Sequence, residues 1–225
     1  MTRVRVMTYN IFMGGRRGAA VHEVVREVAP DVLLVNESPK LPIMWKRQCI
    51  RLSEKWGMRF VGGGRKAGSN MIAVSGDVRV KSSTARKLRQ PLFKPRQGIA
   101  AAQLRVDGKL FGVVSCHLSL TRDGRATEVE QVIAMATTLR GPVVVAGDLN
   151  EKPGGPSWQR LQQVGFIDHG TKSWWTYPAA SPTTRIDALL VRGSVTVEQH
   201  GDPGVAAELQ VAASDHRAIL AVLDL

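Results

Sequence analysis

The sequence predicts an α/β fold in which packed β-sheets carry helices on their outer faces, within a single domain spanning residues 1–225. Short apolar, strand-like runs recur along the chain and outnumber the helical segments. Tight hairpins join some of these strands and helical crossovers join others, a mixture that disfavours one parallel sheet. At 225 residues and 44% apolar content, the chain suits one medium-sized domain, and no repeat or linker divides it.

The N-terminal part is predicted to alternate strands and helices. Val4 to Thr8 alternates apolar and polar residues, the period of a half-buried strand. Val21 to Val28 repeats valine at helical spacing, and Pro30 follows, where a helix cannot continue. Asp31 to Val35 is then predicted to be a buried strand. A second helix is expected from about Met44 to Trp56.

Two loops and a strand pair are expected next. Met71 to Val74 and Val78 to Val80 are predicted to pair through a turn at Gly76-Asp77. Lys81 to Arg96 is polar, basic and aperiodic, which favours a mobile loop on the substrate side. The run Gly62-Gly63-Gly64-Arg65 lacks the Gly-Lys-Ser/Thr of a P-loop, so a plain loop is predicted there.

The C-terminal part continues with a hairpin, helices and buried strands. The hairpin is predicted from Ile99 to Val106 and from Leu110 to Cys116, turning at Asp107-Gly108. Helices are predicted over Thr127 to Leu139 and Ser157 to Gln163. Strands are predicted over Pro142 to Ala146, Ala188 to Val191 and Ala218 to Val222.

The positive charge is concentrated in one segment. The net charge is +12, and residues 40–110 hold 17 Lys and Arg against three acids, whereas residues 111–225 hold 9 against 12. A basic flank beside an acidic centre suits a polyanionic substrate such as nucleic acid. A basic solubility face, or general basicity of the source proteome, explains the same excess, so the charge alone leaves these readings open.

The cysteines and the N-terminus indicate a cytoplasmic protein. Cys49 and Cys116 lie in unrelated contexts, and Cys116 alternates into a strand as a small core residue. No disulfide is predicted, in keeping with a reducing compartment. The charged N-terminus lacks an apolar signal core, and no apolar stretch reaches the length of a membrane span, so no membrane partner is expected.

Polar side chains stand at the ends of the predicted buried strands. Val143 to Ala146 leads into Gly147-Asp148-Leu149-Asn150, and Asp187 and His216 each precede an apolar run. Strand ends of this kind converge at one rim of a sheet, where α/β proteins usually carry their chemistry. Because no serine or cysteine nucleophile lies nearby, these acids, amides and imidazoles suit a hard divalent cation that activates water against a phosphate ester.

Six short motifs occur in the order found in one enzyme superfamily. They are Thr8-Tyr9-Asn10, Asn36-Glu37, Ser115-Cys116-His117-Leu118, Gly147-Asp148-Leu149-Asn150, Arg185-Ile186-Asp187 and Ser214-Asp215-His216. From Tyr9 to His216 the chain therefore resembles the endonuclease/exonuclease/phosphatase superfamily, the fold group of deoxyribonuclease I and exonuclease III. The resemblance implies a four-layer α/β sandwich, in which helices flank two packed, mixed, mainly antiparallel sheets. It also implies a phosphoesterase that depends on Mg²⁺ or Mn²⁺.

Three residues are the predicted metal ligands. Glu37 ends a buried strand, where an uncompensated charge is costly and a bound cation would neutralise it. Asn10 also follows a strand and offers a carbonyl oxygen and an amide donor, although an asparagine at that place is commonly a turn residue. Asp215 points away from its neighbour His216 if the segment is extended, and then reaches the metal region.

Five residues are the predicted catalytic groups. Asp148 and Asn150 lie two residues apart, so an extended segment places both side chains on one side. Asp148 is the acid that would accept a proton from water, and Asn150 is the amide that would hold the water or a phosphoryl oxygen. Gly-Asp-x-Asn is also an ordinary turn sequence. The resemblance pairs His216 with Asp187, which favours a charged imidazole that stabilises the transition state. His117 is predicted as a general acid or phosphate donor, although relatives differ at that position.

Five further residues are candidates for substrate contact. Asn70 and Arg96 resemble positions that precede strands in relatives and are predicted to contact phosphate, with ordinary surface roles as the alternative. Trp174, Trp175 and Tyr177 precede Arg185 on a loop, where they either stack on bases or fill a packed corner.

Together these features predict a divalent-metal-dependent phosphodiester hydrolase, a monomeric nuclease that acts on DNA through direct attack of an activated water. One alternative is a phosphatase or phosphodiesterase on lipid phosphates, inositol phosphates or other small esters, because a fold does not determine a substrate. A second alternative is a non-catalytic DNA-binding module, which the intact acidic and imidazole positions disfavour.

Overall fold

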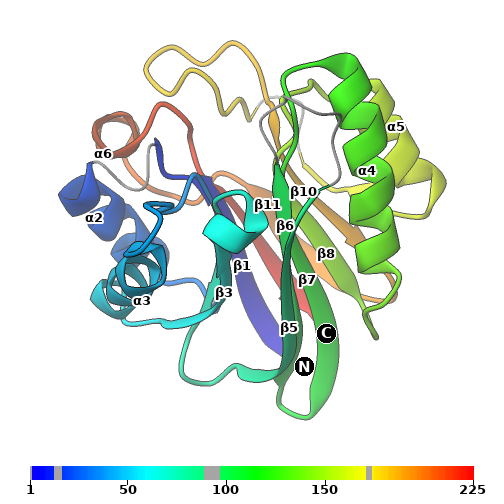
Figure 1. Ribbon diagram of the computed structural model, residues 1–225, viewed down its shortest axis with the longest axis horizontal. Helices are drawn as coiled ribbons and strands as arrows, with labels where there is room; N and C mark the ends of the chain where they lie inside the picture. The colour runs from blue at the N-terminus through cyan, green and yellow to red at the C-terminus, as the bar shows by residue number, and fades with distance from the viewer. Residues whose placement is uncertain (1, 13–16, 89–96, 171–173) are drawn as a thin grey trace.

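The computed structural model describes residues 2–12, 17–88, 97–170 and 174–225, and its centre is a pair of six-stranded sheets packed face to face (Figure 1). Sheet A contains, in spatial order, β11 (Thr196–Gly201), β12 (Ile219–Asp224), β1 (Arg3–Asn10), β2 (Val32–Asn36), β4 (Asn70–Val74) and β3 (Arg59–Gly64). Sheet B contains, in spatial order, β5 (Arg79–Lys87), β6 (Gly98–Val106), β7 (Lys109–His117), β8 (Val143–Asp148), β10 (Asp187–Arg192) and β9 (Ile167–Asp168).

Helices cover the outer face of each sheet, so the predicted four-layer sandwich is confirmed (Figure 1). The helices over sheet A are α2 (Gly18–Val28), α3 (Trp45–Lys55) and α6 (Ala207–Ala213), and those over sheet B are α4 (Arg122–Ala136) and α5 (Pro156–Gln163). A short 3₁₀ helix, η1 (Arg65–Ala67), follows β3. None of the helices in the described ranges is both long enough and apolar enough to cross a membrane.

Strand alternation sorts the buried side chains into an inner core and two outer cores. Val6 of β1 and Val144 of β8 belong to the inner core between the sheets. Their strand neighbours Met7 and Val145 face outward and pack beneath the helices of their own sheet. Residues on both faces of these strands are buried, which explains why the strands read as continuous apolar runs in the sequence.

Among the described strands, each sheet contains one parallel pair, and the two pairs point toward the same edge of the sandwich. The strands β1 and β2 are parallel and joined through α2, and β7 and β8 are parallel and joined through α4. The strands β10 and β12 run antiparallel to β8 and β1, so their first residues reach that same edge. We call this edge the polar rim: the carboxyl ends of β1, β2, β7 and β8 and the segments that enter β10 and β12.

The predicted pairing of Met71 to Val74 with Val78 to Val80 is wrong. The first segment is β4, which pairs with β2 and β3 in sheet A, and the second leads into β5, which pairs with β6 in sheet B. Val78 is buried in the inner core, where the chain crosses from one sheet to the other. The turn residues between the two segments therefore mark a change of sheet, which local sequence does not distinguish from a hairpin.

Two predicted loops are strands instead. Lys81 to Lys87 belongs to β5, an edge strand whose side chains are largely exposed, so it is polar although it is paired. The remainder of that predicted loop, residues 89–96, lies outside the described residues. Gly62 to Gly64 ends β3, where Gly63 has a φ of +111° and an added Cβ would lie 2.1 Å from the Asn70 carbonyl oxygen. Close approach to β4 requires glycine there.

Other elements follow the prediction with shifted ends. The β6–β7 hairpin is confirmed. Helix α4 begins five residues earlier than predicted, at Arg122, because the Thr121 side chain caps it by accepting from the Gly124 N–H. Three elements, β9, β11 and α6, are absent from the prediction. Both cysteines are free, and Cys116 is buried, as predicted; Cys49 is buried too.

Candidate active site at the polar rim

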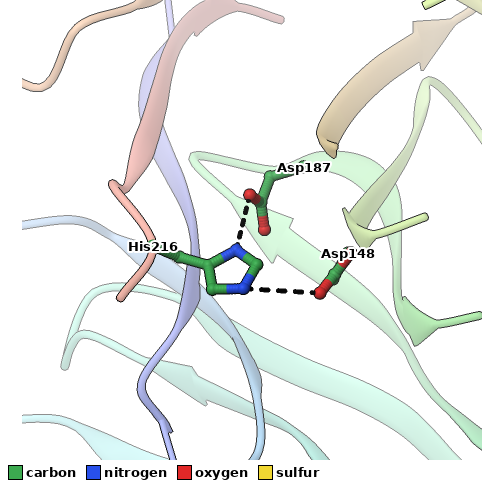
Figure 2. Close-up of side chains that lie close together, drawn as sticks. All are labelled: Asp148, Asp187 and His216. Carbon is green, nitrogen blue, oxygen red and sulfur yellow. Dashed lines mark hydrogen bonds and ion pairs between the residues drawn. The ribbon is translucent and has the colours of Figure 1, made fainter. Parts of the chain in front are cut away.

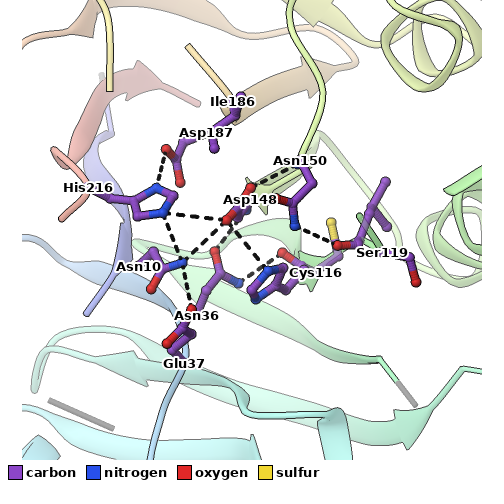
Figure 3. Close-up of polar contacts among 12 residues, drawn as sticks. Asn10, Asn36, Glu37, Cys116, Ser119, Asp148, Asn150, Ile186, Asp187 and His216 are labelled. Atoms are coloured by element: carbon purple, nitrogen blue, oxygen red, sulfur yellow. Dashed lines mark hydrogen bonds and ion pairs between the residues drawn. The ribbon is translucent and has the colours of Figure 1, made fainter. Parts of the chain in front are cut away.

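Strand register brings the predicted polar residues together at the polar rim. Asn10 is aligned with Asn36 at the ends of β1 and β2, and His117 is aligned with Asp148 at the ends of β7 and β8. Asp187, the first residue of β10, is aligned with Asp148 from the other side. The two packed sheets thus bring residues that are far apart in the sequence into one cluster (Figure 3).

Asp148 lies at the centre of this cluster. Its side chain is almost fully buried, and Asn10 Nδ2 lies 3.3 Å from its Oδ2. The Nε2 atoms of His117 and His216 lie 3.5 Å and 3.7 Å from the same oxygen. Burial, followed by the negative charge of Asp187, raises the pKa of Asp148, and the two imidazoles partly oppose that rise. A buried carboxylate with a raised pKa is suited to exchanging a proton with water.

His216 is held between two carboxylates (Figure 2). Its Nδ1 lies 2.9 Å from Asp187 Oδ2, so its Nε2 is the ring nitrogen that faces Asp148. Burial by itself lowers the pKa of His216, but the charge and hydrogen bond of Asp187, with the charges of Asp148 and Asp215, raise it to about 9. The predicted Asp187–His216 contact is therefore present, and the ring is charged at neutral pH.

The Ser214-Asp215-His216 and Arg185-Ile186-Asp187 segments are fixed by hydroxyl groups that the sequence analysis did not single out for this role. Ser214 Oγ donates to the Asn10 carbonyl oxygen at 2.7 Å and accepts from the His216 N–H at 3.1 Å. Thr176 is fully buried, and its Oγ1 accepts from the N–H groups of Ile186 and Asp187 at 3.3 Å and 3.4 Å. These contacts fix Asp187 at the start of β10 and His216 in the segment that enters β12.

Glu37 lies at the edge of the cluster and is linked to it through Asn10. Its φ of +57° places it in the left-handed region, an unusual conformation for a glutamate and a recurrent feature of functional sites. Asn10 Nδ2 lies 3.4 Å from Glu37 Oε1, while Asn10 Oδ1 accepts from the Phe12 N–H at 3.2 Å. Asn10 therefore presents its amide hydrogens to the carboxylates of Glu37 and Asp148.

Asn150 does not lie on an extended segment, so the geometric basis of its prediction is wrong. Its φ is +49°, and its N–H donates to Asp148 Oδ1 at 2.8 Å in a tight turn. Its side-chain amide donates to the Leu118 carbonyl oxygen at 2.8 Å, next to His117. Asn150 nevertheless lies beside Asp148 at the polar rim, because the turn brings it there (Figure 3).

Asn36, which belongs to one of the six motifs but has no role among the predicted site residues, joins the two sheets next to the cluster. It is fully buried, its Oδ1 accepts from the Asp148 N–H at 2.9 Å, and its Nδ2 donates to the Cys116 carbonyl oxygen at 2.9 Å. One amide from sheet A thus fixes the ends of β7 and β8 in sheet B. A polar residue that ends a run of buried apolar residues was the signal available in the sequence.

Asn70 is buried and has a structural role, which speaks against the predicted phosphate contact. Its Nδ2 donates to the carbonyl oxygens of Ala67 and Gly98 at 2.9 Å and 2.7 Å. Its Oδ1 accepts from Asn36 Nδ2 at 2.6 Å. Both amide hydrogens are therefore engaged by the backbone. Arg96, the other predicted phosphate contact, lies outside the described residues.

Asp215 and the loop aromatics lie around the cluster. Asp215 is half-buried, and Ser214 Oγ lies 3.4 Å from its Oδ1. Trp174 packs against the inner core, as a corner residue would, whereas Trp175 is 47% exposed. The Tyr177 ring packs against His216 with a centroid separation of 4.9 Å. Tyr177 is therefore the aromatic residue that reaches the site.

The donor set fits a hard divalent cation. One group of Asp148, Asp187 and His216 has potential ligand atoms within 4.8 Å of one another. In that group, however, His216 Nδ1 and Asp187 Oδ2 already face each other in a hydrogen bond. The carboxylates of Glu37 and Asp215, with that of Asp148 close to Glu37 through Asn10, offer the hard oxygen atoms that Mg²⁺ and Mn²⁺ prefer.

Solved structures share this fold across the whole chain. An endonuclease/exonuclease/phosphatase structure from Bacteroides vulgatus is 19% identical, with a TM-score of 0.81 and coverage of 100% of both chains. A Bacteroides thetaiotaomicron mannosyl-6-phosphatase is 17% identical, with a TM-score of 0.78, 99% of this chain and 100% of that one. D. rerio TDP2 in complex with a single-strand DNA product is 14% identical, with a TM-score of 0.75 and 100% of both chains.

Identities this low establish the fold alone. No curated protein matches the sequence. The profile of the Endonuclease/Exonuclease/phosphatase family, in contrast, matches residues 7–216, a span that includes every residue of the cluster at the polar rim. The match agrees with the four-layer sandwich and with the rim of acids, amides and imidazoles. The chain therefore belongs to the endonuclease/exonuclease/phosphatase family.

Proposed function

We propose that the protein is a divalent-metal-dependent phosphodiesterase, and specifically a nuclease that cleaves DNA by direct attack of an activated water. The observation that carries this proposal is the charged His216, held by Asp187 and directed at the buried carboxylate of Asp148. In phosphoester hydrolysis by water, a carboxylate base can accept the proton of the water, and a cationic donor can stabilise the charge that builds on the phosphoryl oxygens.

The described residues have complementary roles in this proposal. Asp148 orients the attacking water and accepts its proton, and Asn150 supports it from the adjacent turn. His216, kept protonated by Asp187, donates to the phosphoryl oxygens as negative charge builds on them. His117 lies on the other side of Asp148 and assists the leaving oxygen.

A divalent metal completes the site. Glu37 and Asp215 are the proposed ligands, and Asn10 orients Glu37. When bound, Mg²⁺ or Mn²⁺ would supply Lewis-acid polarisation of the phosphate and lower the pKa of a water. The buried free thiols of Cys49 and Cys116 accord with a reducing compartment, and we propose a cytoplasmic monomer.

The charge distribution favours nucleic acid over a small ester. Residues 40–110 carry 17 Lys and Arg against three acids, and salt-dependent attraction to a polyanion is the expected consequence. The similarity to D. rerio TDP2, whose structure holds a single-strand DNA product, is compatible with this substrate. The similarity to a mannosyl-6-phosphatase supports the alternative, a phosphatase or phosphodiesterase on sugar, inositol or lipid phosphates.

The test is a plasmid relaxation assay with Mg²⁺, Mn²⁺ or EDTA. We expect metal-dependent nicking by the wild-type protein and a loss of more than about a hundredfold in Glu37→Gln and in His216→Asn. Glu54→Gln and His169→Asn are matched controls, because these exposed residues lie outside the polar rim and their substitution leaves the rate unchanged.

Other outcomes identify the alternatives. Nicking that survives in both Glu37→Gln and His216→Asn would refute the assigned site. Metal-dependent release of phosphate from sugar or inositol phosphates, without nicking, would establish the small-ester alternative. Salt-sensitive DNA binding without hydrolysis of any ester would instead establish a non-catalytic binding module.

A further inference from the structure

A basic cleft opens beside the polar rim, on the side of Glu37 and His117. It encloses about 930 Å³, near the upper end of the range for small-molecule sites. Five cations from four segments of the chain line it: Lys40, Arg51, Lys55, Arg65 and Lys87. We call this feature the basic cleft and define it by these five residues together with Pro39, Leu41 and Leu52.

The cations of the basic cleft come together only in the folded chain. Arg51 and Lys55 lie one turn apart on α3, so they occupy the same helix face. Arg65 begins η1, Lys40 precedes α3, and Lys87 ends β5 of the other sheet. All five are exposed, and within the described ranges none of them forms an ion pair with a carboxylate. Their charge is therefore available to an anion from solution.

Apolar side chains accompany these cations in the basic cleft. Leu41 is 59% exposed, and it lines the cleft together with Pro39 and Leu52. A cleft that bound only a phosphate group would gain nothing from exposed apolar surface. A single nucleic-acid strand presents both chemistries, because its phosphates need cations and its unstacked bases and sugars gain from apolar contact.

The basic cleft is continuous with the proposed catalytic site. Glu37 and His117 line the cleft, and Asn10 and Asp148 contact these same two residues within the cluster. A strand whose scissile phosphate lies beside the Asp148–His216 pair can thus continue past Glu37 into the cleft. An ester with one phosphate and one sugar would leave the five cations unused.

We propose that the basic cleft binds the stretch of single-stranded DNA next to the scissile phosphate, an inference that rests on the proposed nuclease function. The cations neutralise backbone phosphates, and the apolar residues receive the sugars or base edges between them. The cleft thereby determines affinity for a polynucleotide, while the cluster at the polar rim determines the rate at the bond that is cut.

The test is binding of a fluorescein-labelled oligothymidylate, measured by anisotropy in EDTA over a range of salt. The variant R51Q/K55Q removes two cations from an exposed helix face, where glutamine keeps the helix favourable. We expect affinity to fall about tenfold at moderate salt. The slope of log K against log salt should fall by roughly 1.4, at about 0.7 for each lost phosphate contact.

The matched control is R79Q/K81Q, which removes the same charge from exposed positions at the other end of β5. Lys81 lies six residues from Lys87, or about 20 Å along the strand. This control should bind like the wild-type protein. Equal affinity for wild type and R51Q/K55Q, or an equal loss in the control, would overturn the proposal.

Two further arms separate this inference from the proposed function. Hydrolysis of bis(p-nitrophenyl) phosphate with Mn²⁺ should have the same kcat/KM in the control R79Q/K81Q as in the wild type and should be lost in His216→Asn, so this assay reports on the cluster at the polar rim separately from oligonucleotide binding in EDTA. Failure of the nuclease proposal would appear as absent metal-dependent cleavage in every protein, whatever the binding result. Binding to phosphatidylserine vesicles can be compared in the wild type and R51Q/K55Q. If the substitutions weaken vesicle binding but leave oligonucleotide binding unchanged, the cleft recognises a lipid surface and the proposal is overturned.

Discussion

Replacing Asp187 with asparagine removes the charge that does most to keep His216 protonated. The two side chains are 2.9 Å apart, and the His216 side chain is 7% exposed, so solvent screens the pair weakly. In the folded protein the pKa of His216 is about 9, compared with 6.5 in the unfolded chain. The folded state therefore binds this proton more tightly than the unfolded state does.

The size and sign of the effect follow from proton linkage. A shift from 6.5 to about 9 corresponds to roughly 3 kcal/mol of stability at 1.36 kcal/mol for each pKa unit. Because the folded pKa is raised, this contribution is complete below pH 6.5 and is lost as the pH rises to about 9. Asp148 and Asp215 also raise the pKa of His216, so part of this stability remains without Asp187. We expect Asp187→Asn to remove about 2 kcal/mol of the roughly 3 kcal/mol at pH 6.

The measurement is urea unfolding in EDTA, followed by fluorescence of the five tryptophans, from pH 6 to pH 10. The difference in unfolding free energy between wild type and Asp187→Asn should be about 2 kcal/mol at pH 6 and well below 1 kcal/mol at pH 10. In a His216→Asn background, the same substitution should show no such dependence on pH. A difference that stays constant from pH 6 to pH 10 would refute the charged Asp187–His216 pair.

Three further substitutions test the supporting structure by thermal and urea unfolding. Thr176→Val should cost about 1–2 kcal/mol, because the buried N–H of Asp187 and the part-buried N–H of Ile186 lose their acceptor, while Thr176→Ser should be close to wild type. Gly147→Ala should cost more than about 4 kcal/mol, because its Cβ would lie 1.8 Å from the Cys116 carbonyl oxygen, whereas Gly204→Ala, with no atom within 4 Å, should cost only about 1 kcal/mol. Asn36→Leu should cost about 2–3 kcal/mol, because a buried N–H at the end of β8 loses its acceptor. A Gly147→Ala protein as stable as Gly204→Ala, or neutral changes at Thr176 and Asn36, would contradict these contacts.

Local sequence was sufficient to identify most residues of the candidate site. Strand ends are visible as the points where apolar runs give way to polar residues, and Asp148, Asp187 and His216 occupy such points. The β6–β7 hairpin was equally visible, because its turn lies between two apolar runs. Each of these signals is confined to about ten residues of chain.

The incorrect predictions arose where a distant segment decides the local structure. The glycines at the end of β3 read as a loop, yet pairing with β4 makes them a strand. The polar run of β5 also read as a loop, because an edge strand with exposed faces lacks the apolar period of a buried one. Asn150 was placed on an extended segment, and its hydrogen bonds instead hold it in a turn.

By itself, the sequence determined the fold class and the order of the six motifs, because periodicity, turn residues and strand ends are local properties. The tertiary structure alone decided which groups meet. Asn10 and Asp148 are 138 residues apart, and they touch because the parallel pairs of the two sheets point to one edge. The structural role of Asn36 and the basic cleft have the same origin, since both combine residues from the two sheets. Which sheet a strand joins depends on the long-range burial of apolar surface, and no short window of sequence contains that information.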